Sequence, residues 1–280
     1  IYMKNNINRR KFLELFSCSC CGLILPSCST VPITERKQLK FMSESTINRQ
    51  ASRAYENFRT KTKLITKGKQ LDEIISVGNR IEKAVTSFFV STNEPDPTEN
   101  FSWDYILVDN DKVKNAWCMP GGKIAFYTGM LKITKNINGL AMVMGHEIAH
   151  AVAKHSIERQ SQATVLNVGS QVADIFLGGA IGRTRNTVGK STGLDIFQLG
   201  IMNPFGRKQE SEADYLGLIF ASLAGYDIRE SVKIWERMSE SNKGKAPPQF
   251  LSTHPSNKNR IISLKKWIGE VIVKYPPNIV

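Results

Sequence analysis

The sequence lacks the features that mark several large classes of protein. No segment of its 280 residues repeats at a period of about twenty to fifty residues, which argues against a solenoid, and none is low in complexity. The formal net charge is +13, but no basic stripe interleaved with aromatic residues accompanies it. We therefore expect no nucleic-acid partner and interpret the charge as a solvated surface that is compatible with anionic lipid.

Cysteine is scarce beyond the N-terminal segment, and Cys118 is the one cysteine of the sequence after Cys28. We therefore expect no intramolecular disulfide. Residues 1–27 have a basic start, an apolar stretch and small residues before Cys28, which is the layout of an export signal. The letters "LPSC" resemble a lipobox, whose cysteine is lipidated and becomes the new N-terminus, although Pro26 is uncommon there. A cleaved ordinary signal and a short membrane anchor are the alternatives.

The remaining sequence predicts an α+β fold that is mainly α-helical. A tether over residues 28–43 precedes one folded domain over residues 44–280, and residues 181–206 read as a long loop. Three strand-like runs separated by turn signals predict a small antiparallel sheet over residues 101–109, 113–119 and 123–129. Hydrophobic periodicity predicts helices over residues 44–64, 69–90, 138–155, 156–180, 207–224, 227–242 and 256–273.

The letters "GHEIAH", residues 145–150, fall within one of these predicted helices and match the pattern H-E-x-x-H. A spacing of four residues brings His146 and His150 onto one face, where two imidazoles can bind a single metal ion. Glu147 follows the first histidine directly and is placed to take a proton from a zinc-bound water. His155 is rotated by about 140° from His150 on a continuous helix, so we expect a surface or second-layer residue there.

A catalytic zinc ion needs a third protein ligand and an open position. The best candidate is Glu210 in "RKQESEADYLG", with Asp214 one turn further along the same predicted helix. One carboxylate can bind zinc while the other orients a ligand histidine from the second layer. Glu212 is rotated away from that face. An acidic helix segment alone would indicate only a solvated face, but the two segments together predict a zinc site.

Four segments resemble, in order and spacing, the gluzincin metallopeptidases that include the HtpX heat-shock proteases, the CAAX prenyl proteases, mitochondrial Oma-type proteases and bacterial periplasmic relatives. These segments are "NAWCMPGGKIAFYTGML", "GHEIAHAVAKHS", "ESEADYLGLIFASLAGYD" and "STHPSNKNRI". The chain is most similar to the soluble or lipid-anchored bacterial branch. The resemblance implies a zincin-like fold with His146, His150 and Glu210 as ligands of one zinc ion, Glu147 as general base and Asp214 behind a ligand histidine.

The resemblance also implies roles for three further regions. Asn115, Ala116 and Trp117 match the edge strand on which gluzincins bind an extended substrate, a geometry that makes little demand on side chains. His254 matches a histidine that can reach the zinc as a fourth ligand and hold the enzyme inactive. A lone histidine before a proline is, on sequence alone, more often structural. Arg260 matches an arginine near the active site that stabilises the oxyanion.

These features together predict a zinc metalloendopeptidase that acts on protein or peptide substrates. We expect it in the bacterial periplasm, held at the membrane by lipid on Cys28, with misfolded or misassembled cell-envelope proteins as substrates. The location follows from the N-terminal segment, and the substrates follow from the resemblance alone. The alternative is a chaperone-like binding protein whose zinc site is mostly latent. No oligomeric state is predicted.

Overall fold

The computed structural model of the protein describes residues 28–40, 42–164, 204–241, 248–255 and 258–277. The predicted export signal, residues 1–27, lies outside the described residues, as do most of the predicted loop and residues 165–180 of the predicted helix 156–180. Within the described ranges, no helix has the length and apolar character needed to cross a membrane.

A mixed sheet of four strands lies at the centre of the fold, in the order β3-β4-β6-β5. Its strands are β3 (Leu64–Ile65), β4 (Asp104–Val108), β5 (Ala116–Met119) and β6 (Lys123–Tyr127). Strand β6 pairs antiparallel with β5 but parallel with β4. The sequence predicted that neighbouring strands pair antiparallel. In the structure β6 lies between β4 and β5, so β4 pairs with β6 instead of with β5, and this pair is parallel. Strand β5 is left at the edge.

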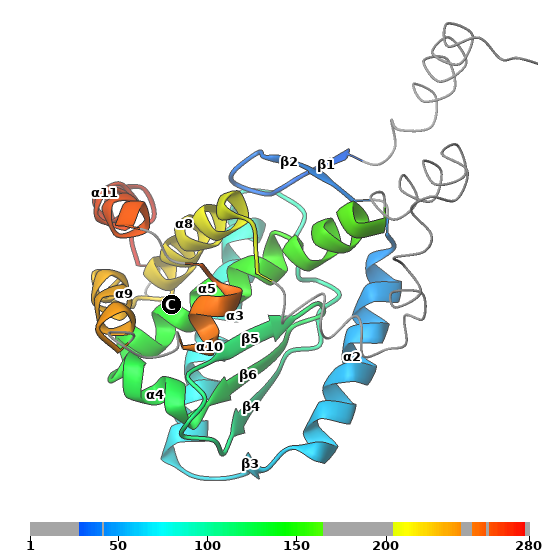
Figure 1. The fold of residues 1–280 in the computed structure, drawn as a ribbon. Coiled ribbons are helices and arrows are strands. Elements are labelled where there is room, and N and C mark those ends of the chain that lie inside the picture. The colour runs from blue at the N-terminus through cyan, green and yellow to red at the C-terminus, as the bar shows by residue number, and fades with distance from the viewer. Residues whose placement is uncertain (1–27, 41, 165–203, 242–247, 256–257, 278–280) are drawn as a thin grey trace, which may run out of the picture.

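Helices cover both faces of this sheet (Figure 1). Side chains on a strand alternate between its faces. Ile106 and Val108 accordingly pack beneath α2 (Glu44–Lys61), whereas Leu107 joins the larger core on the other face. The helices of that larger core are α3 (Lys69–Ser91), α4 (Thr128–Thr134), α5 (Ile137–Val152), α8 (Arg207–Leu223), α9 (Glu230–Ser241), α10 (Gln249–Thr253) and α11 (Lys258–Lys274). The predicted mainly α-helical α+β fold is confirmed.

Helices α5 and α8 pack against each other at unusually short range. A Cβ built on Gly217 would lie 3.0 Å from the backbone nitrogen of His146, and one on Gly145 would lie 2.9 Å from the carbonyl oxygen of Gly217. Only glycine leaves room for two backbones at this separation. The close approach brings residues of α8 within reach of the histidines on α5.

Helix α5 ends at Val152, three residues earlier than the sequence predicted. Lys154 adopts a left-handed backbone with a φ of 57°, and a new helical segment covers residues 155–164. A left-handed residue interrupts an α-helix. The chain therefore changes direction between His150 and His155, and the 140° rotation expected for a continuous helix does not apply.

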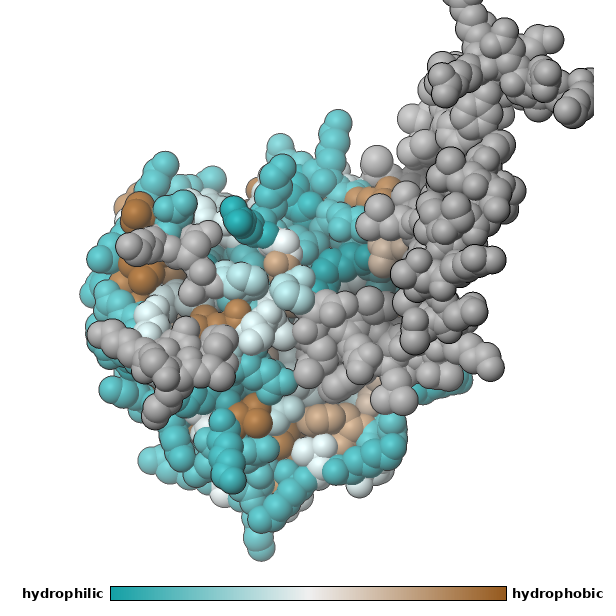
Figure 2. Space-filling model, viewed as in Figure 1, coloured by the Kyte–Doolittle hydropathy of each residue, from teal (hydrophilic) through white to brown (hydrophobic). Residues whose placement is uncertain are grey.

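The segment predicted as a tether contains a small hairpin. Strands β1 (Cys28–Thr30) and β2 (Lys37–Leu39) pair antiparallel and lie at the end of α8 (Figure 1). The face of the molecule in Figure 2 is mostly hydrophilic, and its hydrophobic side chains form small separate groups among the coloured residues. Small scattered groups of apolar side chains are ordinary on the surface of a folded protein.

Candidate active site

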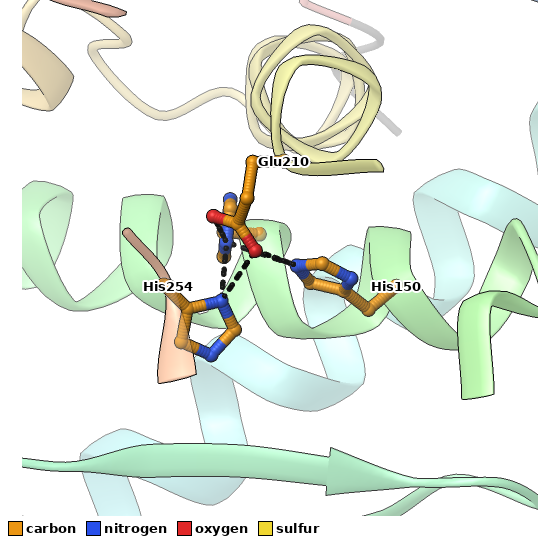
Figure 3. A group of neighbouring side chains, drawn as sticks. His150, Glu210 and His254 are labelled. Atoms are coloured by element: carbon orange, nitrogen blue, oxygen red, sulfur yellow. Dashed lines mark hydrogen bonds and ion pairs between the residues drawn. The ribbon is translucent and has the colours of Figure 1, made fainter. Parts of the chain in front are cut away.

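Four buried side chains converge between helices α5 and α8. His146 and His150 project from one face of α5, Glu210 projects from the first turn of α8, and His254 directly follows α10. One ligand atom from each residue lies within 4.8 Å of the others. Figure 3 shows Glu210 extending from its helix toward both His150 and His254. The structure thus brings together the three predicted ligands and the predicted fourth.

The separations between these atoms fit one tetrahedral zinc ion. Zn–N bonds of about 2.0–2.1 Å at tetrahedral angles place neighbouring ligand atoms about 3.3 Å apart. Nε2 of His146 is 3.1 Å from Nε2 of His150 and 3.2 Å from Nδ1 of His254. Oε1 of Glu210 is 3.4 Å from Nε2 of His150 and 3.0 Å from Nδ1 of His254. Imidazole and carboxylate donors also suit zinc chemically.

The electrostatic environment prepares these groups to bind a cation. Burial lowers the pKa of both His146 and His150, which keeps the two imidazoles neutral. Burial alone would raise the pKa of Glu210, but His254 and Arg260 outweigh it and hold that pKa well below its usual value. Neutral imidazoles and an ionised carboxylate are the protonation states that a metal ion requires of its ligands.

Asp214 and Arg260 form a second layer behind the ligand atoms. Oδ1 of Asp214 lies 3.1 Å from Nδ1 of His146, on the side of the ring away from the cluster. Arg260 donates to both oxygens of Asp214, at 2.5 and 2.8 Å, and its Nη1 lies 2.6 Å from Oε2 of Glu210. Its guanidinium also lies over the ring of Trp235. Asp214 can therefore fix the ring of His146, as carboxylates behind metal-binding histidines do.

Glu147 lies beside the cluster with its side chain buried. It accepts a hydrogen bond from the backbone of Cys118 in strand β5, and its Oε1 is 3.4 Å from Nε2 of His254. Burial raises the pKa of Glu147 to about 7, with His254 opposing the shift and Glu210 adding to it. A carboxyl group with a pKa near neutrality is suited to general base catalysis.

His254 is held between aromatic rings and two carboxylates. Its ring stacks on those of Phe250 and Phe205. Burial would lower the pKa of His254, but the charges of Glu210 and Glu147 raise it. These contacts keep the side chain at the cluster rather than in solvent.

The predicted substrate strand lies at the edge of the sheet and next to α5. The side chain of Trp117 packs against Tyr55 and Phe58 of α2, on the face away from the cluster, so only its backbone lies on the side of the site. Asn115 is buried, and its Oδ1 has no hydrogen-bond partner among the described residues. The carbonyl oxygen of Lys114 accepts a hydrogen bond from the backbone of Phe250 in α10.

Sequence reasoning missed a group of residues behind His150. Nδ1 of His155 lies 2.8 Å from Nδ1 of His150, and its Nε2 lies 2.8 Å from Oε2 of Glu212. Arg36 binds the same oxygen of Glu212 from the N-terminal hairpin. His155 is fully buried, so the expectation of a surface position is wrong and that of a second layer is right. No spacing pattern links Arg36 to residues so far along the chain.

A buried set of two histidines and a glutamate, with a carboxylate beside it and an edge strand next to it, is the arrangement typical of zinc metallopeptidases. The model of peptidase family M48 matches residues 77–268, and the chain belongs to this family. The match lies within the predicted folded domain, residues 44–280. It confirms the predicted kinship with metallopeptidases, while the bacterial periplasmic branch is not established.

The matching proteins include relatives of two kinds. The chain is 36% identical over 179 residues to the mitochondrial metalloendopeptidase OMA1 of Schizosaccharomyces pombe, covering 62% of this chain and 49% of that protein. It is 27% identical over 268 residues to OMA1 of Saccharomyces cerevisiae, covering 92% and 74%. It is 28% identical over 161 residues to the beta-barrel assembly-enhancing protease of Yersinia pestis, covering 56% and 32%. The chain thus spans about half the length of the fission yeast relative.

The comparisons contradict the predicted location in the bacterial periplasm. Six relatives bear names that place them in mitochondria, and this finding overturns the predicted location. Residues 1–27 misled the prediction because a basic start is common to export signals and mitochondrial targeting segments. Lipidation of Cys28 belongs to the same interpretation and stays a prediction, since the side chain of Cys28 is outside the described residues.

Proposed function

We propose that the chain hydrolyses peptide bonds of protein substrates as a zinc-dependent endopeptidase, with His146, His150 and Glu210 as the ligands of one zinc ion. The observation that supports this function is the tetrahedral spacing of their buried ligand atoms with Glu147 alongside. When bound, zinc supplies Lewis-acid chemistry, which lowers the pKa of a water molecule to about 7 and polarises a carbonyl group.

Glu147 would act as the general base. Its carboxylate, with a pKa of about 7, can accept the proton of the attacking water and pass it to the leaving amine. The hydrogen bond from the backbone of Cys118 fixes the carboxylate against strand β5, which keeps it near a substrate bound along that strand. The positive charge of Arg260, which lies beside Glu210, would stabilise negative charge that develops on the substrate carbonyl.

The substrate would add to the sheet as an extended strand along β5. Main-chain hydrogen bonds hold such a strand with little demand on its sequence. Asn115 supports this position, because a buried amide oxygen without a partner can accept a hydrogen bond from a substrate backbone. Unfolded segments present extended backbone, so we propose misfolded or misassembled proteins as the substrate class. The name of the Yersinia pestis relative, which refers to beta-barrel assembly, is compatible with this class.

The described arrangement is a closed one. His254 contributes a fourth possible ligand atom to the cluster. The backbone N–H of Phe250 donates a hydrogen bond to the carbonyl oxygen of Lys114, next to strand β5, so this oxygen already has a partner. A catalytic zinc site keeps one position free of protein ligands. We therefore propose that His254 holds the resting enzyme inactive until α10 moves. This contact is also what favours the second candidate function, a protein-binding factor whose zinc site is mostly latent.

Proteolysis and zinc content distinguish these candidates. The protein is incubated with casein, an unfolded model substrate, and bound zinc is measured on the same samples. We expect Glu147→Gln to retain zinc and lose turnover by about a hundredfold or more, the range of general base catalysis. Glu210→Ala should lose zinc and turnover together. Equal turnover by the wild type and Glu147→Gln would overturn the endopeptidase function and leave the binding factor.

A further inference from the structure

A chain of hydrogen bonds joins His150 to the N-terminal hairpin on the side opposite the metal-binding cluster. Nδ1 of His150 lies 2.8 Å from Nδ1 of His155, and Nε2 of His155 lies 2.8 Å from Oε2 of Glu212. The same oxygen accepts a hydrogen bond of 2.7 Å from Nε of Arg36. We call these three supporting residues, His155, Glu212 and Arg36, the Arg36 relay.

The hydrogen bonds of the relay determine which ring nitrogen carries the proton in His150 and in His155. Nε2 of His150 faces the other ligand atoms, so metal binding requires its lone pair and leaves the proton on Nδ1. That proton can only be donated to Nδ1 of His155, which must then carry its own proton on Nε2. An ionised carboxylate only accepts hydrogen bonds, and Oε2 of Glu212 is placed to accept this one. Each donor along the relay thus faces one acceptor.

Arg36 is itself firmly anchored. Its Nη1 and Nη2 each donate to Glu158 at 2.8 Å, and Gln209 donates to the same carboxylate at 2.7 Å. Thr34 of the same hairpin donates its hydroxyl hydrogen to Glu212. Glu158 and Glu212 are buried, which strengthens these charged hydrogen bonds. The guanidinium therefore lies between two carboxylates, one belonging to the relay and one only to the anchor of the hairpin.

We propose that His155, Glu212 and Arg36 are positioning residues that fix the ring orientation and tautomer of His150, so that the N-terminal hairpin is part of the metal centre. Loss of comparable partners behind metal ligands lowers metal affinity by about 10–100-fold. The proposal rests on the proposed function in one respect, namely that His150 binds the metal.

The two carboxylates around Arg36 provide a matched pair of variants for zinc affinity. Competition with a chelator measures the dissociation constant of zinc for the full chain. We expect Glu212→Leu, which removes the acceptor of His155, to weaken zinc binding by about tenfold or more, and Glu158→Leu, which removes only the anchor of Arg36, to change it by less than about threefold. Each substitution replaces a buried carboxylate by a side chain of similar size, and circular dichroism with chelator present checks that each variant is folded. Equal zinc affinities for the two variants would overturn the proposal.

The tautomer of His150 is a second readout, which a merely structural role of His155 would not change. Nitrogen-15 NMR on metal-free protein at about pH 8, where an ordinary histidine is neutral, distinguishes protonation at Nδ1 from protonation at Nε2. We expect Nδ1–H in the wild type, and Nε2–H directed at Glu210 in His155→Leu. The same tautomer in both proteins would overturn the relay. A wild type with this tautomer but without zinc binding would instead refute the proposed function.

Discussion

Replacing Glu147 by glutamine should stabilise the metal-free protein at alkaline pH while it removes the proposed base. Glutamine has the volume of glutamate and keeps an oxygen that can accept the hydrogen bond from the backbone of Cys118. It does not carry the charge. The ionised carboxylate is buried, and burial makes a charge unfavourable in the folded state. The substitution therefore removes an energetic cost that the native residue carries for its function.

The size of this cost follows from the pKa of Glu147. The folded-state pKa is about 7 against an ordinary value of 4.5, and this difference corresponds to about 3 kcal/mol. Between these two values the folded protein binds more protons than the unfolded chain, so the free energy of unfolding falls as pH rises. The loss is complete at about pH 8 and absent below about pH 4.5. Glu147→Gln should recover it.

Thermal unfolding in the presence of chelator measures this effect. At about pH 8 we expect the melting temperature of Glu147→Gln to exceed that of the wild type by about 6–12 °C, and at about pH 5 the difference should shrink to about 2–3 °C. Added zinc should reduce the difference, because a neighbouring cation favours the ionised carboxylate. Equal melting temperatures at alkaline pH without zinc would refute the argument that Glu147 is held in an unfavourable charged state.

Two other substitutions test the site and the packing that forms it. His254→Ala should raise casein hydrolysis about tenfold with zinc retained, if the closed arrangement accounts for about nine-tenths of the molecules, and unchanged turnover would contradict the resting-state role of His254. Gly217→Ala should lower the free energy of unfolding by about 1–3 kcal/mol in chemical denaturation, because the added Cβ would meet backbone of α5 at 3.0 Å. Gly269→Ala is the matched control, since nothing lies within 4 Å of its Cβ.

The parts of the site that the sequence predicted are those in which helix periodicity sets the geometry. His146 and His150 are four positions apart, as are Glu210 and Asp214, and each pair lies on one face of its helix. The first and last residues of most predicted helices lie close to the observed ones for the same reason. Periodicity carries no information about pairing between elements, so the parallel contact of β4 with β6 was not predicted. The glycine contact between α5 and α8, which brings Glu210 to the histidines, was equally invisible in the sequence.

His155 shows why the support of a metal site is harder to predict than its ligands. On a continuous helix His155 would leave the face of His150, so it could not bind the same metal ion. A ligand imidazole, however, also needs a partner at the nitrogen opposite the metal, and the turn at Lys154 brings His155 there. Its own partners come from α8 and from the N-terminal hairpin. The spacing of His146 and His150 could therefore be read from the local sequence, whereas the groups that support His150 come from distant parts of the chain.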